Sequence, residues 1–378
     1  MKIIFLLLFV NISTLVAQNL TGKVLDAKTK EPIAYLVIQV DESEKYQITN
    51  ESGEFSFNLS DVNNKTLIFE NTYYLTKKIQ VQNSDNLLVE LEPNSVTLEE
   101  IIIASKPYSQ VFDDIFNAKS NTIDKQIKLE TYYIESVFDN ENIIKTADGL
   151  VDFYILDKKK NFVNSKINES RIRVIQDKTD EELQAISLEA SPSKIVEASI
   201  QMSQVKDLGK NKKYEFHTTA FKVGNKQMHS LYFYPKQNAT DDLMLTGKII
   251  FDAESKKIEE ISYELVKEKS KYAQKYKSVL LIAKLKINDI KISAKYTIIN
   301  GFNVVNFSNY HVNMEIKMFG KNAYFNNTLK MFTHKMDILE TKNYEKDYFQ
   351  NVSLFKFGNH NHSNFWEKEP FKNWELKF

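Results

Sequence analysis

The chain contains no cysteine, and its 378 residues include only nine glycines and six prolines. Without thiols, the protein has no disulfides, no lipid-modified N-terminal cysteine and no cysteine nucleophile. The scarcity of glycine and proline argues against long linkers and disordered segments. Lysine plus arginine and aspartate plus glutamate both number 50, so no net charge attracts nucleic acid or an anionic membrane.

The sequence also lacks the short motifs of common enzyme classes. It has no Gly-x-Ser-x-Gly, no Walker A and no Gly-x-Gly-x-x-Gly. Its six histidines stand neither in His-Glu-x-x-His nor in the His-x-x-Glu spacing of zinc carboxypeptidases. We therefore predict no catalytic residue and no cofactor. A hydrolase with a dispersed active site stays the enzymatic alternative.

Residues 1–18 have the pattern of a signal peptide. Lys2 precedes the apolar run Ile3–Val10, and Ala17 is a small residue suited to cleavage before or after Gln18. The run is too short to span a bilayer, and no later stretch is long and apolar enough to do so. We expect an exported protein that is periplasmic or associated with the outer membrane, and an uncleaved interfacial anchor is the alternative.

What the sequence has in abundance is aromatic residues, with 25 phenylalanines and 19 tyrosines, and these favour strands. Between Leu20 and Pro93, short strand-forming runs alternate with turn signals. Glu54–Leu59 alternates polar and apolar residues directly after the turn-forming Asn50–Gly53. Several short strands separated by turns predict a small β-sandwich over residues 19–104.

Four segments of this region carry a family pattern: Gly22–Asp26, Glu31–Ile33, Thr49–Phe55 and Leu91–Pro93. They resemble the carboxypeptidase regulatory-like domain, a transthyretin-like or immunoglobulin-like sandwich common in Bacteroidetes cell-envelope proteins. The chain departs from the family pattern at Lys30, where glycine is frequent, and at Asn71-Thr72-Tyr73, which replaces Ser-x-x-Gly-Tyr. The resemblance implies an accessory module of the envelope and is silent on activity.

Helices are expected in two places after the sandwich. A connector helix is predicted within residues 105–128, where Pro107 suits the first turn and one apolar stripe follows it. The stripe comprises Val111, Phe112, Ile115 and Phe116. It predicts packing against the second domain. A helical insertion is predicted near 180–208, interrupted at Ser191-Pro192.

Residues 129–378 otherwise read as successive β-hairpins. Asn300-Gly301 is the strongest two-residue turn signal, and Gly224-Asn225 is another. Gly247–Asp252 with Ile258–Tyr263 resembles a hairpin of lipoprotein-carrier-like half-barrels. The predicted fold class is therefore mostly β: the sandwich, then a larger curved antiparallel sheet with a few helices. The half-barrel resemblance implies a lipid, glycan or polypeptide held in the concave face.

One histidine pair is a candidate metal site. On a strand, His360 and His362 would face the same side, with Glu367 as a third candidate ligand. A metal enzyme using this pair is one alternative function. The surrounding Gly358–Asn364 is rich in turn formers, which favours a polar loop without metal.

The last residues leave the architecture open in one respect. Trp374–Phe378 alternates apolar residues and ends in phenylalanine, as outer-membrane barrels do, so a small β-barrel is the alternative. The predicted helices, and lysines on both faces of several strands, argue against it. We expect the tail to dock on the sheet through its aromatic residues. These are Phe365, Trp366, Phe371 and Trp374.

The favoured function is that of an exported envelope protein that binds or scaffolds a partner without catalysis. The partner would be an envelope protein, a lipid or a glycan, and membrane association would need no transmembrane helix. The lysine-rich segment Lys267–Lys295 is interpreted as a water-exposed strand face and not as a nucleic-acid surface.

Overall fold

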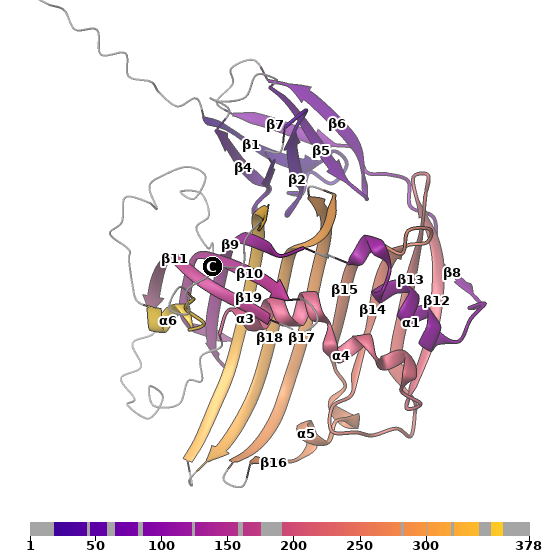
Figure 1. Ribbon diagram of the computed structural model, residues 1–378, viewed down its shortest axis with the longest axis vertical. Coiled ribbons are helices and arrows are strands. Elements are labelled where there is room, and N and C mark those ends of the chain that lie inside the picture. The colour runs from indigo at the N-terminus through magenta and orange to yellow at the C-terminus, as the bar shows by residue number, and fades with distance from the viewer. Residues whose placement is uncertain are drawn as a thin grey trace, which may run out of the picture.

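The computed structural model describes residues 19–43, 46–58, 65–81, 86–122, 125–157, 162–174, 191–280, 283–299, 301–318, 321–339 and 349–357. Figure 1 shows a small β-rich unit above a large curved sheet, with helices lying across one face of that sheet. The protein is mostly β, as predicted, with 61% strand and 13% helix. The predicted signal peptide lies outside the described residues.

The small unit is a sandwich of two sheets, in the orders β4-β1-β7 and β3-β2-β5-β6. Alternate residues of the strands point inward, so Ile38 and Phe69 of one sheet are buried together with Val24 and Val89 of the other. The predicted turn before β4 is confirmed, since Gly53 has φ +73°. The strands are β1 (Asn19–Asp26), β2 (Val37–Val40), β3 (Tyr46–Ile48), β4 (Glu54–Asn58), β5 (Thr66–Asn71), β6 (Tyr74–Gln80) and β7 (Leu87–Leu91).

The large sheet has twelve strands in the order β11-β10-β9-β19-β18-β17-β15-β14-β13-β12-β8, with β16 beside β17. The predicted hairpins are confirmed: β12 pairs with β13, β14 with β15, and β17 with β18. The strands are β8 (Glu100–Ile102), β9 (Ile127–Asp139), β10 (Asn142–Asp157), β11 (Phe162–Val174), β12 (Tyr214–Val223), β13 (Lys226–Pro235), β14 (Leu245–Asp252), β15 (Ile258–Leu265), β16 (Lys277–Leu280), β17 (Ala283–Ile299), β18 (Phe302–Met318) and β19 (Lys321–Ile338).

Short helices cover one face of the large sheet (Figure 1). Phe112 and Ile115 of α1 are buried in the main core, together with Ile195, Val196 and Val205. The helix α1 is shorter than residues 105–128, and Pro107 precedes it in an extended conformation (ψ 142°). The helices are α1 (Tyr108–Phe116), η1 (Lys119–Asn121), α3 (Ser193–Val196), the π-helix η2 (Glu197–Gln201), α4 (Ser203–Lys206), η3 (Leu208–Lys210), η4 (Lys267–Lys269), α5 (Lys271–Gln274) and α6 (Leu354–Phe357).

Side chains of the protein itself fill much of the helix-covered face. Tyr133, Phe153 and Phe251 are buried beneath the helices. The space between Met202 and Val304 amounts to about 30 Å³, roughly the volume of one water molecule. A larger space of about 200 Å³ lies beside α1 and Phe251. Among the described residues, the centre of this face near Met202 therefore offers no room for a lipid chain.

One histidine of the sheet makes stability depend on pH. His334 lies at an irregularity in the β19–β9 pairing, and burial lowers its pKa from 6.5 to about 4. Protonation of His334 therefore opposes folding. Above pH 6.5 the ring is neutral in both states and does not affect the free energy of unfolding. Between pH 6.5 and 4 the unfolded chain binds the proton more readily than the folded one, so stability falls. Because the ring is partly buried, we expect His334 to lower stability by about 2 kcal/mol at pH 4.5 relative to pH 7.5.

Urea unfolding at these two pH values measures the effect. Carboxylates also titrate in this range, so the relevant quantity is the difference between wild type and His334→Gln. The variant should lose less stability on acidification than wild type. An equal loss in both proteins would show that the native site accepts a proton as readily as the unfolded chain.

Candidate binding cleft between the two domains

The segment that joins the sandwich to the helices is itself an edge strand of the large sheet. Val96 forms a bridge with Val223, and the Thr97 hydroxyl accepts a hydrogen bond from Lys222 N at 2.8 Å. β8 then continues along β12, with Ile101 opposite Thr219. Residues 96–102 thus pair with the second sheet, at the C-terminal end of the segment 19–104 that the sequence predicted as the first domain.

Glu99 fixes this segment to the sheet face opposite the helices. Its carboxylate accepts hydrogen bonds from the hydroxyls of Thr219 at 2.7 Å and Tyr232 at 3.0 Å. Burial, followed by this contact with Glu99, raises the pKa of Tyr232. The phenol therefore stays a donor, and the linker is held in one position relative to the sheet.

The sandwich docks on the same face through Tyr35. Its ring stacks on Phe307 with the centroids 4.2 Å apart, and Phe332 lies beside it at 5.0 Å. Asn306 Nδ2 donates to the Tyr35 carbonyl at 3.2 Å. The Tyr35 hydroxyl donates to Glu51, which also pairs with Lys330 of β19 at 2.6 Å. The two units therefore share an aromatic, hydrogen-bonded and ionic interface.

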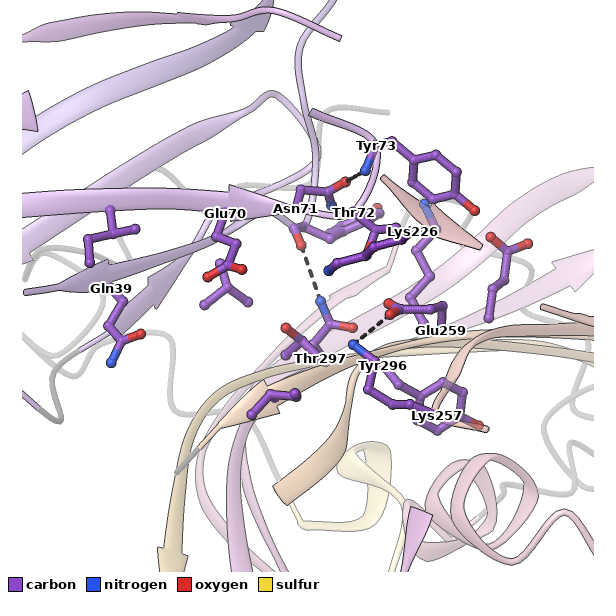
Figure 2. Close-up of a pocket in the computed structure, with 17 residues that line it drawn as sticks. Gln39, Glu70, Asn71, Thr72, Tyr73, Lys226, Lys257, Glu259, Tyr296 and Thr297 are labelled. Carbon is purple, nitrogen blue, oxygen red and sulfur yellow. Dashed lines mark hydrogen bonds and ion pairs between the residues drawn. The ribbon is translucent and has the colours of Figure 1, made fainter. Parts of the chain in front are cut away.

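A cavity of about 290 Å³ lies beside this interface. Figure 2 shows side chains of the sandwich facing side chains of the large sheet across it. Its upper wall comes from β2, β5 and the turn after β5, and its lower wall from β13, β15, β17 and β18. The lining residues include Gln39, Ile68, Glu70, Asn71, Thr72, Tyr73, Lys226, Lys257, Glu259, Glu260, Lys295, Thr297 and Asn306.

The cleft holds charges of both signs, three carboxylates and three ammonium groups. Glu259 is satisfied within the wall by Lys257, 2.5 Å away. Glu260 and Lys295 are register partners on β15 and β17. Among the described residues, neither of these two forms an ion pair, nor do Glu70 and Lys226. Four charged groups are thus free to contact a ligand.

Tyr73 forms one end of the cleft. Its ring packs against Val223, Met228 and other apolar residues of the sheet. Burial, followed by the carboxylates of Glu260 and Glu259, raises its pKa to about 12. The hydroxyl therefore remains protonated at neutral pH and can donate a hydrogen bond.

The comparison with protein families agrees with the sandwich geometry. A family model described as CarboxypepD_reg-like domain matches residues 20–103. The N-terminal sandwich is a carboxypeptidase regulatory-like domain. Such a domain is a common non-catalytic β-sandwich. Among curated proteins, none matches the chain.

The regulatory-like domain departs from its family pattern at the cleft. Asn71, Thr72 and Tyr73 stand where the sequence replaces the usual Ser-x-x-Gly-Tyr, and all three line the cavity. The Asn71 side chain accepts a hydrogen bond from Tyr73 N at 2.8 Å, which stabilises the turn (Figure 2). This departure was the one signal for the cleft in the sequence. It could be interpreted only once the structure showed the large sheet on the other side of the cavity.

The other candidate residues do not contribute to this site. His360, His362 and Glu367 lie outside the described residues, as do the tail aromatics. Within the described ranges, no group of three histidine, aspartate or glutamate side chains could hold a metal ion. No helix in the same ranges is long and apolar enough to cross a membrane.

Proposed function

We propose that this is an exported cell-envelope binding protein without catalytic activity, whose ligand occupies the cleft between the regulatory-like domain and the large sheet. One observation supports the site: free charged groups from both domains converge on one cavity at their interface. Binding sites often form at domain interfaces, and 290 Å³ is near the lower end of the usual range, roughly 300–1,000 Å³. Export is supported by the apolar run Ile3–Val10 behind Lys2.

The chemistry of the cleft favours a polypeptide over a lipid or a glycan. Lys226 and Lys295 can pair with acidic side chains, and Glu70 and Glu260 with basic ones. Gln39 and Asn71 present amides that can bond a peptide backbone. A lipid tail would leave these polar groups buried without partners, which is costly. A neutral glycan would leave the charged groups without opposite charges.

The test is a peptide array of mixed-charge heptapeptides probed with the labelled full chain. We expect binding to peptides that carry both charge signs. The double variant Lys226→Glu/Lys295→Glu should bind them at least about tenfold more weakly, a loss of about 1.4 kcal/mol. The matched control is Lys284→Glu, an exposed lysine of β17 that does not line the cleft.

Equal binding by the double variant, or no peptide bound by wild type, would contradict the proposed site. Export is tested separately by cell fractionation. Recovery in osmotic-shock fluid or with the outer membrane would support it, whereas retention in the cytoplasm would contradict it.

A further inference from the structure

The strand β8 leaves an unusual edge on the large sheet. It is the last strand of the sheet, and no strand in the described ranges lies beyond it (Figure 1). Leu98, Ile101 and Ile103 along this edge are 90%, 78% and 97% exposed. Edge strands normally carry charges, bulges or a cover that prevent pairing with another chain. An open edge lined by aliphatic side chains therefore indicates a surface that another strand covers.

The sequence of this edge is complementary to itself. Glu100–Lys106 reads Glu-Ile-Ile-Ile-Ala-Ser-Lys, with an acid at one end, a base at the other and apolar or small residues between. We propose that two copies of the chain associate by antiparallel pairing of this segment about Ile103. In that register Glu100 of each copy lies opposite Lys106 of the other, and Ile103 lies opposite its own equivalent.

The local structure suits this pairing. β8 ends at Ile102, so the pairing would extend the strand to Lys106. In the extended strand Ile101 and Ile103 would share one face, where they would meet Ile103 and Ile101 of the second copy diagonally. Ile102 would lie opposite Ala104, which is small enough to avoid crowding. A cavity of about 200 Å³ between this segment and α1, lined in part by Ile102, Ile103 and Val111, leaves room for apolar side chains.

The charged ends are available. Among the described residues Glu100 makes no ion pair, and it is exposed. Lys106 pairs with Asp114 at 2.9 Å, but both side chains are about half exposed. Such surface pairs contribute little to stability, so Lys106 can exchange Asp114 for Glu100 of the second copy at small cost. The pairing is independent of the ligand cleft and goes beyond the proposed function.

Sedimentation equilibrium of the purified full chain tests the proposal. Wild type should be a dimer, and Ile101→Lys/Ile103→Lys should weaken dimerisation by at least about 100-fold. The control Leu88→Lys changes an exposed leucine of β7 in the same way and should leave the dimer unchanged. Circular dichroism confirms that each variant is folded. A monomeric wild type, or a dimer that survives the isoleucine changes, overturns the proposal.

The register is tested by exchanging the charges. Glu100→Lys alone and Lys106→Glu alone each place like charges opposite one another and should weaken the dimer. The double variant Glu100→Lys/Lys106→Glu restores opposite charges and should recover the wild-type affinity. Failure of the double variant to recover overturns pairing about Ile103. The proposal is also overturned if the purified chain is a monomer and this edge pairs only with a strand of another protein.

Discussion

Replacing Arg171 by methionine should lower the free energy of unfolding by about 3–5 kcal/mol. Arg171 on β11 and Asp148 on β10 are register partners, and their side chains are only 9% and 1% exposed. The guanidinium contacts the carboxylate through Nε at 2.8 Å and through Nη2 at 2.8 Å. Tyr132 donates a further hydrogen bond to the same carboxylate. Without Arg171, the buried carboxylate of Asp148 would keep its hydrogen bond from Tyr132 but would have no positive charge beside it.

Urea unfolding followed by circular dichroism measures this loss. The double variant Asp148→Ala/Arg171→Met removes both charges and should cost less than the sum of the two single changes, because no buried charge is left alone. The matched control is Lys30→Met, which breaks an exposed pair with Glu90 at 2.9 Å and should cost at most about 1 kcal/mol. Similar losses in Arg171→Met and Lys30→Met would contradict the expected dependence on burial.

This ion pair also bears on the cleft. Tyr132 belongs to the apolar cluster of Phe307 and Phe332 on which Tyr35 of the regulatory-like domain rests. Asp148 and Arg171 therefore help to position Tyr132, which lies beneath the domain interface. A substitution of Asp148 or Arg171 should therefore perturb the docking surface more than the helix-covered core on the other side of the sheet.

The sequence predicted features that depend on neighbouring residues. The hairpin at Gly224-Asn225 depends on the backbone freedom of its turn residues, and Gly224 indeed has φ +57°. The apolar stripe correctly identified Phe112 and Ile115 as the buried side of the connector helix. The helix nevertheless ends at Phe116, and Asn121 donates to Ile115 O at 2.8 Å and to Lys256 O at 2.7 Å. A distant turn thus helps to fix the path of the chain after the helix, which local periodicity cannot show.

The cleft could not be predicted, because its two walls are far apart in the chain. Glu70 and Lys226 face one space only because β8 ties the linker to β12 and Tyr35 docks on β18. Each of these contacts joins residues more than about 100 positions apart, beyond the reach of periodicity or turn chemistry. The free charges were visible in the sequence as ordinary surface residues. Their convergence is a property of the domain arrangement.

Replacing Tyr35 by alanine should loosen the regulatory-like domain from the large sheet. The stacked ring on Phe307 is one apolar contact of this docking, beside those of Tyr46 and Tyr73, and large aromatic truncations cost roughly 3–5 kcal/mol. Because Tyr35 is not fully buried, we expect about 3 kcal/mol at the lower end of that range. Hydrogen exchange should accelerate in β2 and around Phe307, and peptide binding in the cleft should weaken. The linker bound along β12 should keep the two domains adjacent.

Two companion variants separate the ring from the hydroxyl and the backbone. Tyr35→Phe keeps the stacking and loses only the bond to Glu51 at 3.1 Å, so exchange should stay close to wild type. Tyr35 has φ +62°, a left-handed conformation that costs a non-glycine residue roughly 1–2 kcal/mol. Tyr35→Gly removes the ring but also this strain, so it should be more stable than Tyr35→Ala yet equally loose at the interface. Unchanged exchange in Tyr35→Ala would mean that the other contacts, those of Tyr46, Tyr73 and the Glu51–Lys330 pair, suffice for docking. In that case the strained backbone at Tyr35 would need another explanation than the contact with Phe307.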